Sequence, residues 1–283
     1  MKSRKRVADL FTYAFLLLVL AFVLIPLVYT IAGSFKSNME IMTHPEKIFP
    51  IEPTLDNYVQ AMSNPRFNIP KLFWNSTWYT VLSMVITLTI STMTGYVFAR
   101  AEFPGKKVVF AVFSSLMFIS IGSITIYPVF EVLDLFGLST SLWGLIVMKF
   151  FSVGIVNIYM VRSYIWTLPK ALDEAAAIDG CGFIGTFVRI ICPLLKPVLA
   201  TLSILSFKGA WNDYLMPTLF TMSTPDQRTL MSAIVALKNS GSAASNWNLM
   251  LAGATVGLIP VLIVYAMFNK HFVDGIAAGA VKG

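Results

Sequence analysis

Four residues that could bind a polar ligand lie close together inside one apolar stretch: Lys208, Trp211, Asn212 and Asp213. Lys208 and Asn212 are four residues apart, so a helix places them on one face. The Trp211 ring is a flat apolar surface of the kind that stacks on sugars, and Asn212 and Asp213 can hydrogen-bond hydroxyl groups. Polar groups within a bilayer are costly and usually mark a pathway or a pair, so the cluster predicts a substrate pathway. The alternative is that these groups only join helices through hydrogen bonds.

The composition is that of a membrane protein. Of the 283 residues 57% are hydrophobic and 12% charged, whereas a soluble domain has about 25% charged residues. Two histidines and two cysteines are too few for a histidine-rich metal site or a disulfide framework. The sequence contains no phosphate-binding glycine-rich loop, nucleophile elbow or zinc-binding helix, so we expect no catalysis, no metal and no cofactor in this chain.

We expect an all-α, polytopic membrane protein that forms a single transmembrane domain over residues 1–283. A helix that crosses about 30 Å of hydrocarbon needs about 20 largely apolar residues. Six stretches meet this requirement: Leu10–Ile31, Trp74–Phe98, Val108–Phe130, Leu142–Tyr164, Val198–Phe220 and Leu249–Phe268. The first is longer than the apolar core of a secretory signal, which is about 7–15 residues, and is interpreted as an uncleaved helix.

The distribution of basic residues predicts the orientation. With the N-terminus in the cytoplasm, the inner segments hold about twice as many lysines and arginines as the outer ones, which places both termini inside. The net charge of +7 is therefore interpreted as a topology signal, and no nucleic-acid partner is expected.

A further lysine, Lys149, lies inside the fourth predicted span. It lies about seven residues, and Asp213 about six, from the outer end of its span, so at about 1.5 Å per residue their depths match. One interpretation is an ion pair between them. The other is that Lys149 and Lys208 give the pathway a positive lining for an acidic substrate, such as a uronic-acid oligosaccharide. Replacing both lysines with methionine distinguishes the two interpretations, since only the second predicts a selective loss of acidic sugar uptake.

The inner segment Ile165–Pro197 is amphipathic and too charged to span the membrane. The residue before Pro169 is pushed out of the helical region, which ends one helix there. Glu174–Ala177 are good helix formers, and Gly180 can adopt the left-handed conformation that ends a helix. A second amphipathic stretch begins at Gly182. The pattern predicts a helix–glycine–helix elbow on the cytoplasmic face.

The spacing in this elbow resembles the signature of the inner-membrane permease subunits of bacterial ABC importers. That signature is E-A-A, three residues, G, nine residues, then I-x-L-P. The matching residues here are Glu174, Ala175, Ala176, Gly180, Ile190 and Pro193. The chain departs from it at Cys192, where the family usually has leucine. The resemblance implies that the elbow is a coupling helix seated in a cleft of a cytoplasmic ATPase, with Glu174 as the charged contact.

Other segments resemble the maltose-type carbohydrate permeases, in particular their six-span partner. These segments are LPKALDEAAAIDG, NSTWYTVLSMVITLTISTMTGYVFARAEFPGKK, the WND-x-L-x-P string at Trp211–Pro217 and the terminal GIAAGAVKG. The resemblance covers nearly the whole chain. It implies import of oligosaccharides or related polyols across the bacterial cytoplasmic (inner) membrane. The implied partners are a second homologous permease, an ATPase dimer that binds ATP and magnesium, and an external solute-binding protein.

The same resemblance implies roles for two further segments, the C-terminal tail and one outer loop. The tail Asp274–Gly283 would reach the ATPase interface. The outer loop Thr221–Asn248 would contact the binding protein, and its tip Asn239–Ser245 would probe the sugar cleft of that protein.

Three alternatives stay open. An ABC permease for another solute class would keep the elbow and change the fifth span. A gradient-driven secondary transporter or channel would need no ATPase; the elbow and the absence of a visible internal repeat argue against it. A purely structural scaffold would tolerate the loss of Asn212 and Asp213.

Overall fold

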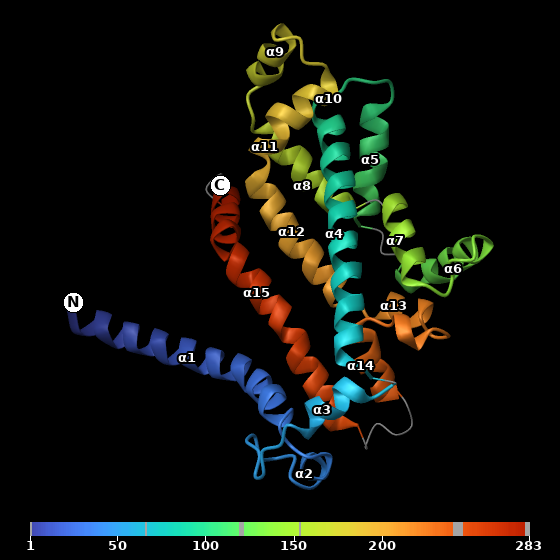
Figure 1. The fold of residues 1–283 in the computed structure, drawn as a ribbon. Coiled ribbons are helices and arrows are strands. Elements are labelled where there is room, and N and C mark those ends of the chain that lie inside the picture. Colours follow the sequence, from blue (N-terminus) through green and yellow to red (C-terminus); the bar gives the residue numbers. More distant parts are fainter. Residues whose placement is uncertain (1, 66, 119–121, 153, 240–245, 281–283) are drawn as a thin grey trace. The chain divides into compact units, whose positions relative to one another are not determined.

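The computed structural model describes residues 2–65, 67–118, 122–152, 154–239 and 246–280 (Figure 1). Within these ranges the chain forms helices and no strand, which confirms the all-α class. The chain divides into two compact units. One comprises residues 1–72 and 233–259, and the other comprises residues 73–232 and 260–283. Each unit is described by itself.

The first unit contains α1 (Lys2–Gly33), α2 (Asn38–Thr43) and α3 (Asp56–Ser63), with parts of α14 (Leu230–Asn239) and α15 (Trp247–Ala280). Buried Asn57 organises the connection after α1. Its side-chain amide donates to the carbonyls of Ser34 (2.7 Å) and Lys36 (2.8 Å). It also accepts a hydrogen bond from the Asn248 amide at 2.8 Å. The segment after α1 is therefore held to both α3 and α15 by one side chain.

The second unit is a bundle around the long helix α4 (Ile69–Arg100). Its other elements, in chain order, are α5 (Lys106–Leu116), η1 (Gly122–Thr125), α6 (Ile126–Leu135), α7 (Leu142–Phe151), α8 (Ile155–Trp166), α9 (Ala171–Ile178), α10 (Phe183–Thr186), η2 (Phe187–Ile191), α11 (Cys192–Leu194), α12 (Lys196–Trp211), α13 (Leu215–Phe220) and η3 (Pro225–Gln227). The C-terminal half of α4 packs on α8 and α12 through a core that includes Tyr96, Val161 and Leu202. Its N-terminal half packs on α6, α7 and α13 through Tyr79, Leu145 and Phe220.

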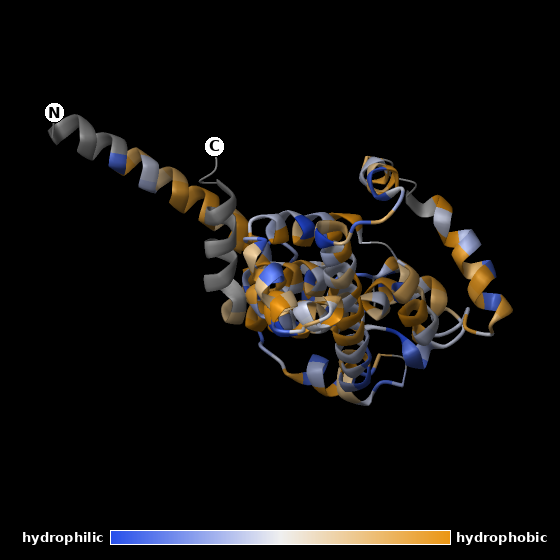
Figure 2. Ribbon diagram, turned by 90° about the horizontal axis from the view of Figure 1, so that it is seen from above, coloured by the Kyte–Doolittle hydropathy of each residue, from blue (hydrophilic) through white to orange (hydrophobic). Residues whose placement is uncertain are grey.

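Three helices in the described residues are long and apolar enough to cross a membrane: Asp9–Gly33, Ile69–Arg100 and Trp247–Met267. Two bent pairs qualify when joined, α7 with α8 (43°) and Phe183–Leu194 with α12 (79°). On α1, large apolar side chains are widely exposed, for example Phe22 at 78%, and Figure 2 colours much of the described part of this helix as hydrophobic. Such an apolar surface is typical of contact with lipid or another protein. These segments overlap five of the six predicted spans, and the count of six stays a prediction.

Three predicted spans are not continuous helices. The fourth, Leu142–Tyr164, is the bent pair of α7, which ends at Phe151, and α8, which begins at Ile155. In the third, Val108–Phe130, α5 ends at Leu116 and α6 begins only at Ile126, after the short 3-10 turn that starts at Gly122. In the fifth, Val198–Phe220, α12 ends at Trp211 and α13 begins at Leu215. The Asp213 carboxylate accepts the Met216 N–H at 3.4 Å. The side chain thus takes the place of a helical carbonyl, and such local bonds compete with helix continuation.

Candidate functional site

A small polar cavity lies between four helices of the second unit. Its lining comes from α4 (Ser83, Thr87), α7 (Lys149), α8 (Asn157) and α12 (Leu205, Ser206, Gly209, Ala210). The cavity volume is about 200 Å³. Since one water takes about 30 Å³ of the liquid, this space holds several waters or one ring-sized polar group.

Two hydroxyl groups in this cavity are not fully bonded. The Ser206 hydroxyl is buried and has no hydrogen-bond partner among the described residues. Ser83 is 2% exposed, and its hydroxyl makes no hydrogen bond of good geometry with the described residues. The polar group near this hydroxyl is the Tyr79 side chain, one helical turn earlier on α4. Leaving a buried polar group unbonded costs about 1–3 kcal/mol. The cavity is therefore suited to a guest that brings its own donors and acceptors.

Lys149 supplies the positive charge of the cavity. Its ammonium lies near enough to the Asp213 carboxylate for an electrostatic interaction. No direct salt bridge joins it to a carboxylate in the part of the chain that the structure describes. Lys149 and Asp213 thus interact at a distance without a direct ion pair, and Lys149 is one of the residues that line the cavity.

Asp213 is held in place by its other contacts. The Tyr79 hydroxyl of α4 donates to Oδ2 of Asp213 at 3.4 Å, and the Met216 N–H donates to Oδ1 at 3.4 Å. The carboxylate therefore ties the break between α12 and α13 to the neighbouring helix α4. Broken helices whose freed backbone groups line a cavity are a common way to build transport sites in membranes.

The other members of the predicted cluster do not share one surface. Trp211 is 2% exposed; its ring stacks on Phe207, with centroids 5.7 Å apart, and meets Phe73 edge-on at 5.6 Å. Lys208 on α12 and Asn212, directly after the end of this helix, are both exposed. In this conformation the Trp211 ring is part of the packed interior, and its role in a pathway stays a prediction.

The polar residues Ser83, Thr87, Asn157 and Ser206 were not singled out from the sequence. One signal was present: Ser83 and Thr87 are four residues apart within the second predicted span, and so share a helix face. Asn157 and Ser206 lack such a partner on their own helices, and only the packing of four helices brings them together.

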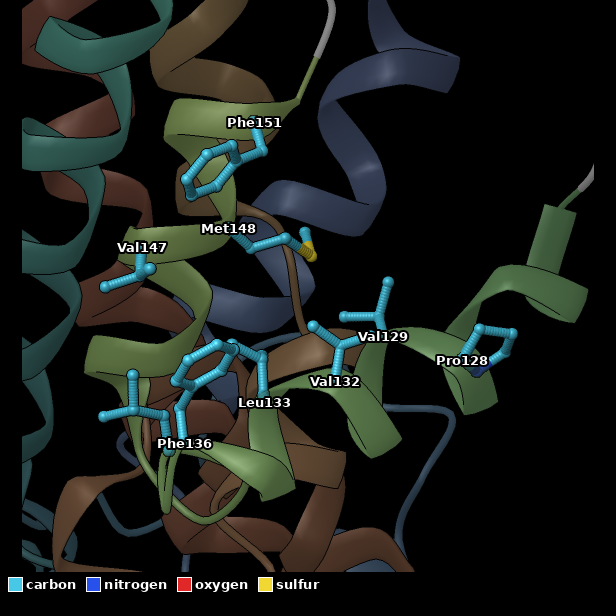
Figure 3. A pocket seen from close by; sticks show the side chains of 9 residues that line it. Pro128, Val129, Val132, Leu133, Phe136, Val147, Met148 and Phe151 are labelled. Atoms are coloured by element: carbon cyan, nitrogen blue, oxygen red, sulfur yellow. The ribbon is translucent and has the colours of Figure 1, made fainter.

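Another cavity in the second unit is of a different kind. It measures about 760 Å³ and lies between α6 and α7 (Figure 3). Its nine lining residues are all apolar: Pro128, Val129, Val132, Leu133, Phe136, Leu138, Val147, Met148 and Phe151. With no group to bond a hydroxyl or a charge, it is not a candidate site for a polar substrate.

The predicted elbow region has the following local geometry. Helix α9 ends at Ile178, Gly180 has φ of 78°, and α10 begins at Phe183 after Gly182. Figure 1 shows α9 as the outermost helix at this end of the second unit. Glu174 and Ala175 are exposed, whereas Ala176 is buried. Ile190 lies half-buried in the π-helical segment η2, and Pro193 is exposed in α11. The first turn of α9 thus presents Glu174 outward.

Two predicted contact segments fall partly outside the description. Of the loop tip Asn239–Ser245, residues 240–245 lie outside the described residues, as do residues 281–283 of the C-terminal tail. The contacts assigned to them stay predictions.

Residues 101–277 match the family described as binding-protein-dependent transport system inner membrane component. The chain belongs to this family. It is 32% identical to the multiple sugar-binding transport system permease protein MsmG of Streptococcus mutans, over 100% of both chains. It is 30% identical to the galactooligosaccharides transport system permease protein GanQ of Bacillus subtilis, over 100% of this chain and 99% of the relative. As an inner membrane component, the chain is a membrane protein, in agreement with its apolar helices.

One solved structure has the same fold. It is a chain of a bacterial ABC transporter involved in the import of the acidic polysaccharide alginate, with a TM-score of 0.78 and 24% sequence identity. The match covers 94% of this inner membrane component and 97% of the solved chain. At this level of identity the likeness concerns the fold.

Proposed function

We propose that this inner membrane component is the permease subunit of an ATP-driven importer of oligosaccharides or related sugars. The observation that carries the proposal is the spacing of Glu174-Ala175-Ala176, Gly180, Ile190 and Pro193, on the segment where a left-handed Gly180 follows the end of α9. The relatives named for the transport of multiple sugars and galactooligosaccharides support the substrate class. The chain forms half of the translocation pathway, as one transmembrane domain over residues 1–283.

Coupling to the ATPase takes place at the elbow. Glu174 and Ala175 are exposed on α9 and available to a partner, and the small alanines let a partner approach the helix closely. Gly180, Ile190 and Pro193 shape the elbow and its return into α12. The ATPase subunits bind ATP and magnesium, and this chain contributes no catalytic group. Alternating access requires contacts that differ between the two states, and the elbow is the lever through which ATPase closure acts.

The substrate pathway passes the polar cavity. Lys149 provides a positive charge there, and the hydroxyl and amide groups around it suit a sugar ring. An acidic sugar unit, such as a uronate, complements this lining better than a neutral one. Asp213 positions the break at the end of α12, while Lys208, Trp211 and Asn212 extend the pathway along that helix in the conformation that admits substrate.

The remaining partners follow from the same assignment. A second homologous permease completes the pathway, an ATPase dimer binds on the cytoplasmic side, and an external solute-binding protein delivers the sugar. Both termini are cytoplasmic, as the bias of lysines and arginines favours.

Affinity purification of the tagged chain from its native membranes, followed by mass spectrometry, tests the assignment. A second permease and an ATPase should co-purify. Glu174→Ala should release the ATPase and keep the second permease, whereas Glu102→Ala, at a neighbouring exposed carboxylate, should release neither. If the unmodified chain comes out alone or as a homo-oligomer, the proposal is wrong and a gradient-driven transporter becomes the better explanation.

A further inference from the structure

Helix α9 is fastened to the end of α4 by one arginine. Arg100 is the last residue of α4, and its Nε lies 2.9 Å from Oδ2 of Asp173, in the first turn of α9. The two side chains are 7% and 25% exposed. The same guanidinium donates from Nη2 to the Leu168 carbonyl at 2.9 Å. Arg100 thus holds both α9 and the segment that leads into it.

The second arm of the elbow is attached one helical turn earlier on α4. The Tyr96 ring is 3% exposed and packs on Phe183 and Phe187, with centroids 4.5 Å and 4.9 Å away. Its hydroxyl donates to the Phe183 carbonyl at 3.3 Å. Tyr96 and Arg100 are four residues apart and share one face of α4. Both arms of the elbow are therefore attached to successive turns on one face of the same helix.

The two attachments differ in kind. The arm that contains α10 and η2 is anchored by aromatic and aliphatic packing, including Ile191 and Leu195 at 0% exposure. In α9, by contrast, only Ala176 is buried. Beside the packing of Ala176, α9 is joined to α4 by the ion pair of Asp173 with Arg100. Because this pair is largely shielded from solvent, salt screens it less than an exposed pair.

We propose that Arg100 is a positioning residue for coupling, which latches α9 to α4 through Asp173. The inference rests on the proposed function, because it concerns the helix that receives the ATPase. In α9, Asp173 pairs with Arg100, and the adjacent Glu174 is exposed. Force applied at Glu174 is then transmitted to α4. Without the latch, α9 turns about the flanking Pro169 and Gly180, and ATPase closure is not passed on.

The test uses the full complex in proteoliposomes and a reporter that needs no known substrate. Cys181 and Cys192 are replaced with serine, and Ser206→Cys places one thiol in the polar cavity. The rate at which a membrane-impermeant maleimide labels this thiol is measured with and without ATP plus vanadate. In the reference complex, trapping should change the rate at least about fivefold, the lower end of usual allosteric couplings.

The latch variants are Asp173→Asn, Arg100→Met and the double variant. Each should abolish the change in labelling rate while the ATPase stays bound and hydrolyses ATP. The double variant should be no worse than either single one, because all three lack the same ion pair. Glu102→Gln is the matched control: it breaks the neighbouring pair with Lys106, whose carboxylate side is 89% exposed, and should leave the change intact.

The outcomes separate the two proposals. Latch variants that keep the full nucleotide-dependent change overturn the role of Arg100. A reference complex whose labelling never responds to nucleotide overturns the proposed function itself. If the neutral variants do not assemble, Arg100→Lys replaces them. It keeps the charge but cannot bind Asp173 and Leu168 in the same geometry, so it should give a reduced change, and an undiminished one again overturns the latch.

Discussion

Replacing Lys149 with methionine tests whether the polar cavity selects acidic substrates. The substitution keeps the length and apolar stem of the side chain and removes only the ammonium group. A hydrogen bond to a charged group contributes about 1.5–3 kcal/mol. Losing one such bond to a sugar carboxylate lowers affinity about 10- to 150-fold.

The assay compares uptake of a uronic-acid oligosaccharide and a neutral one, both below saturation, in cells that carry the complete importer. Lys149→Met should reduce uptake of the acidic sugar by that factor and change neutral uptake little. Lys107→Met is the matched control. Lys107 is exposed on α5 and is not among the residues that line the cavity, so its replacement should affect both sugars little.

A second variant separates the loss of a ligand contact from damage to the site. Lys149→Met also removes the cation that interacts with Asp213. The double variant Lys149→Met with Asp213→Asn removes both charges, while the amide oxygen introduced at position 213 can still accept the Met216 N–H. If misplacement of Asp213 explains the defect, the double variant recovers uptake of the acidic sugar. Equal losses for acidic and neutral sugars in Lys149→Met refute the reasoning.

Three further changes have defined expected outcomes. Gly180→Ala forces a side chain into a left-handed conformation, at a cost of about 1–2 kcal/mol, and should weaken ATPase co-purification; Gly182→Ala, in extended backbone, should not. Gly95→Ala places a Cβ 2.7 Å from a side chain of α8, and should lower the thermal unfolding temperature in detergent by overpacking. Ser76→Ala removes the acceptor, 2.7 Å away, of the buried Leu230 N–H, and should speed hydrogen exchange of that amide, since an unbonded buried amide costs about 1–3 kcal/mol.

Hydropathy and local backbone rules predict part of this structure. The unbroken helices α1, α4 and α15 coincide with long apolar stretches, since length and apolarity alone are enough to identify such segments. Gly180 adopts the expected left-handed conformation, because a residue without Cβ is the usual choice there. The long helices and the conformation of Gly180 are determined by residues close together in the sequence, and this is why the sequence predicts them.

The breaks and the cavity depend on distant contacts and were not predicted. The fifth predicted span runs across the end of α12, yet the helix stops there, where the Asp213 carboxylate accepts hydrogen bonds from the Met216 N–H and the Tyr79 hydroxyl. Lys149 and Asp213 lie near enough to interact, as their matching depths predict. Both residues are described by the structure, and no direct ion pair joins them. Trp211 illustrates the same limit, since its neighbour Phe73 belongs to another helix.

The long helix α4 connects the features that matter for transport. At its C-terminal end Arg100 and Tyr96 hold the elbow, and Ser83 lines the cavity. At about 1.5 Å per residue, Ser83 lies about 25 Å from Arg100 along the helix. Gly95 lies between them, and α8 packs so closely against it that a side chain at this position would have no room. This stretch of α4 is therefore tightly packed and is not a hinge. We propose that a displacement applied at Arg100 moves the cavity wall with the helix, and that the latch in this way links ATPase closure to access of the cavity.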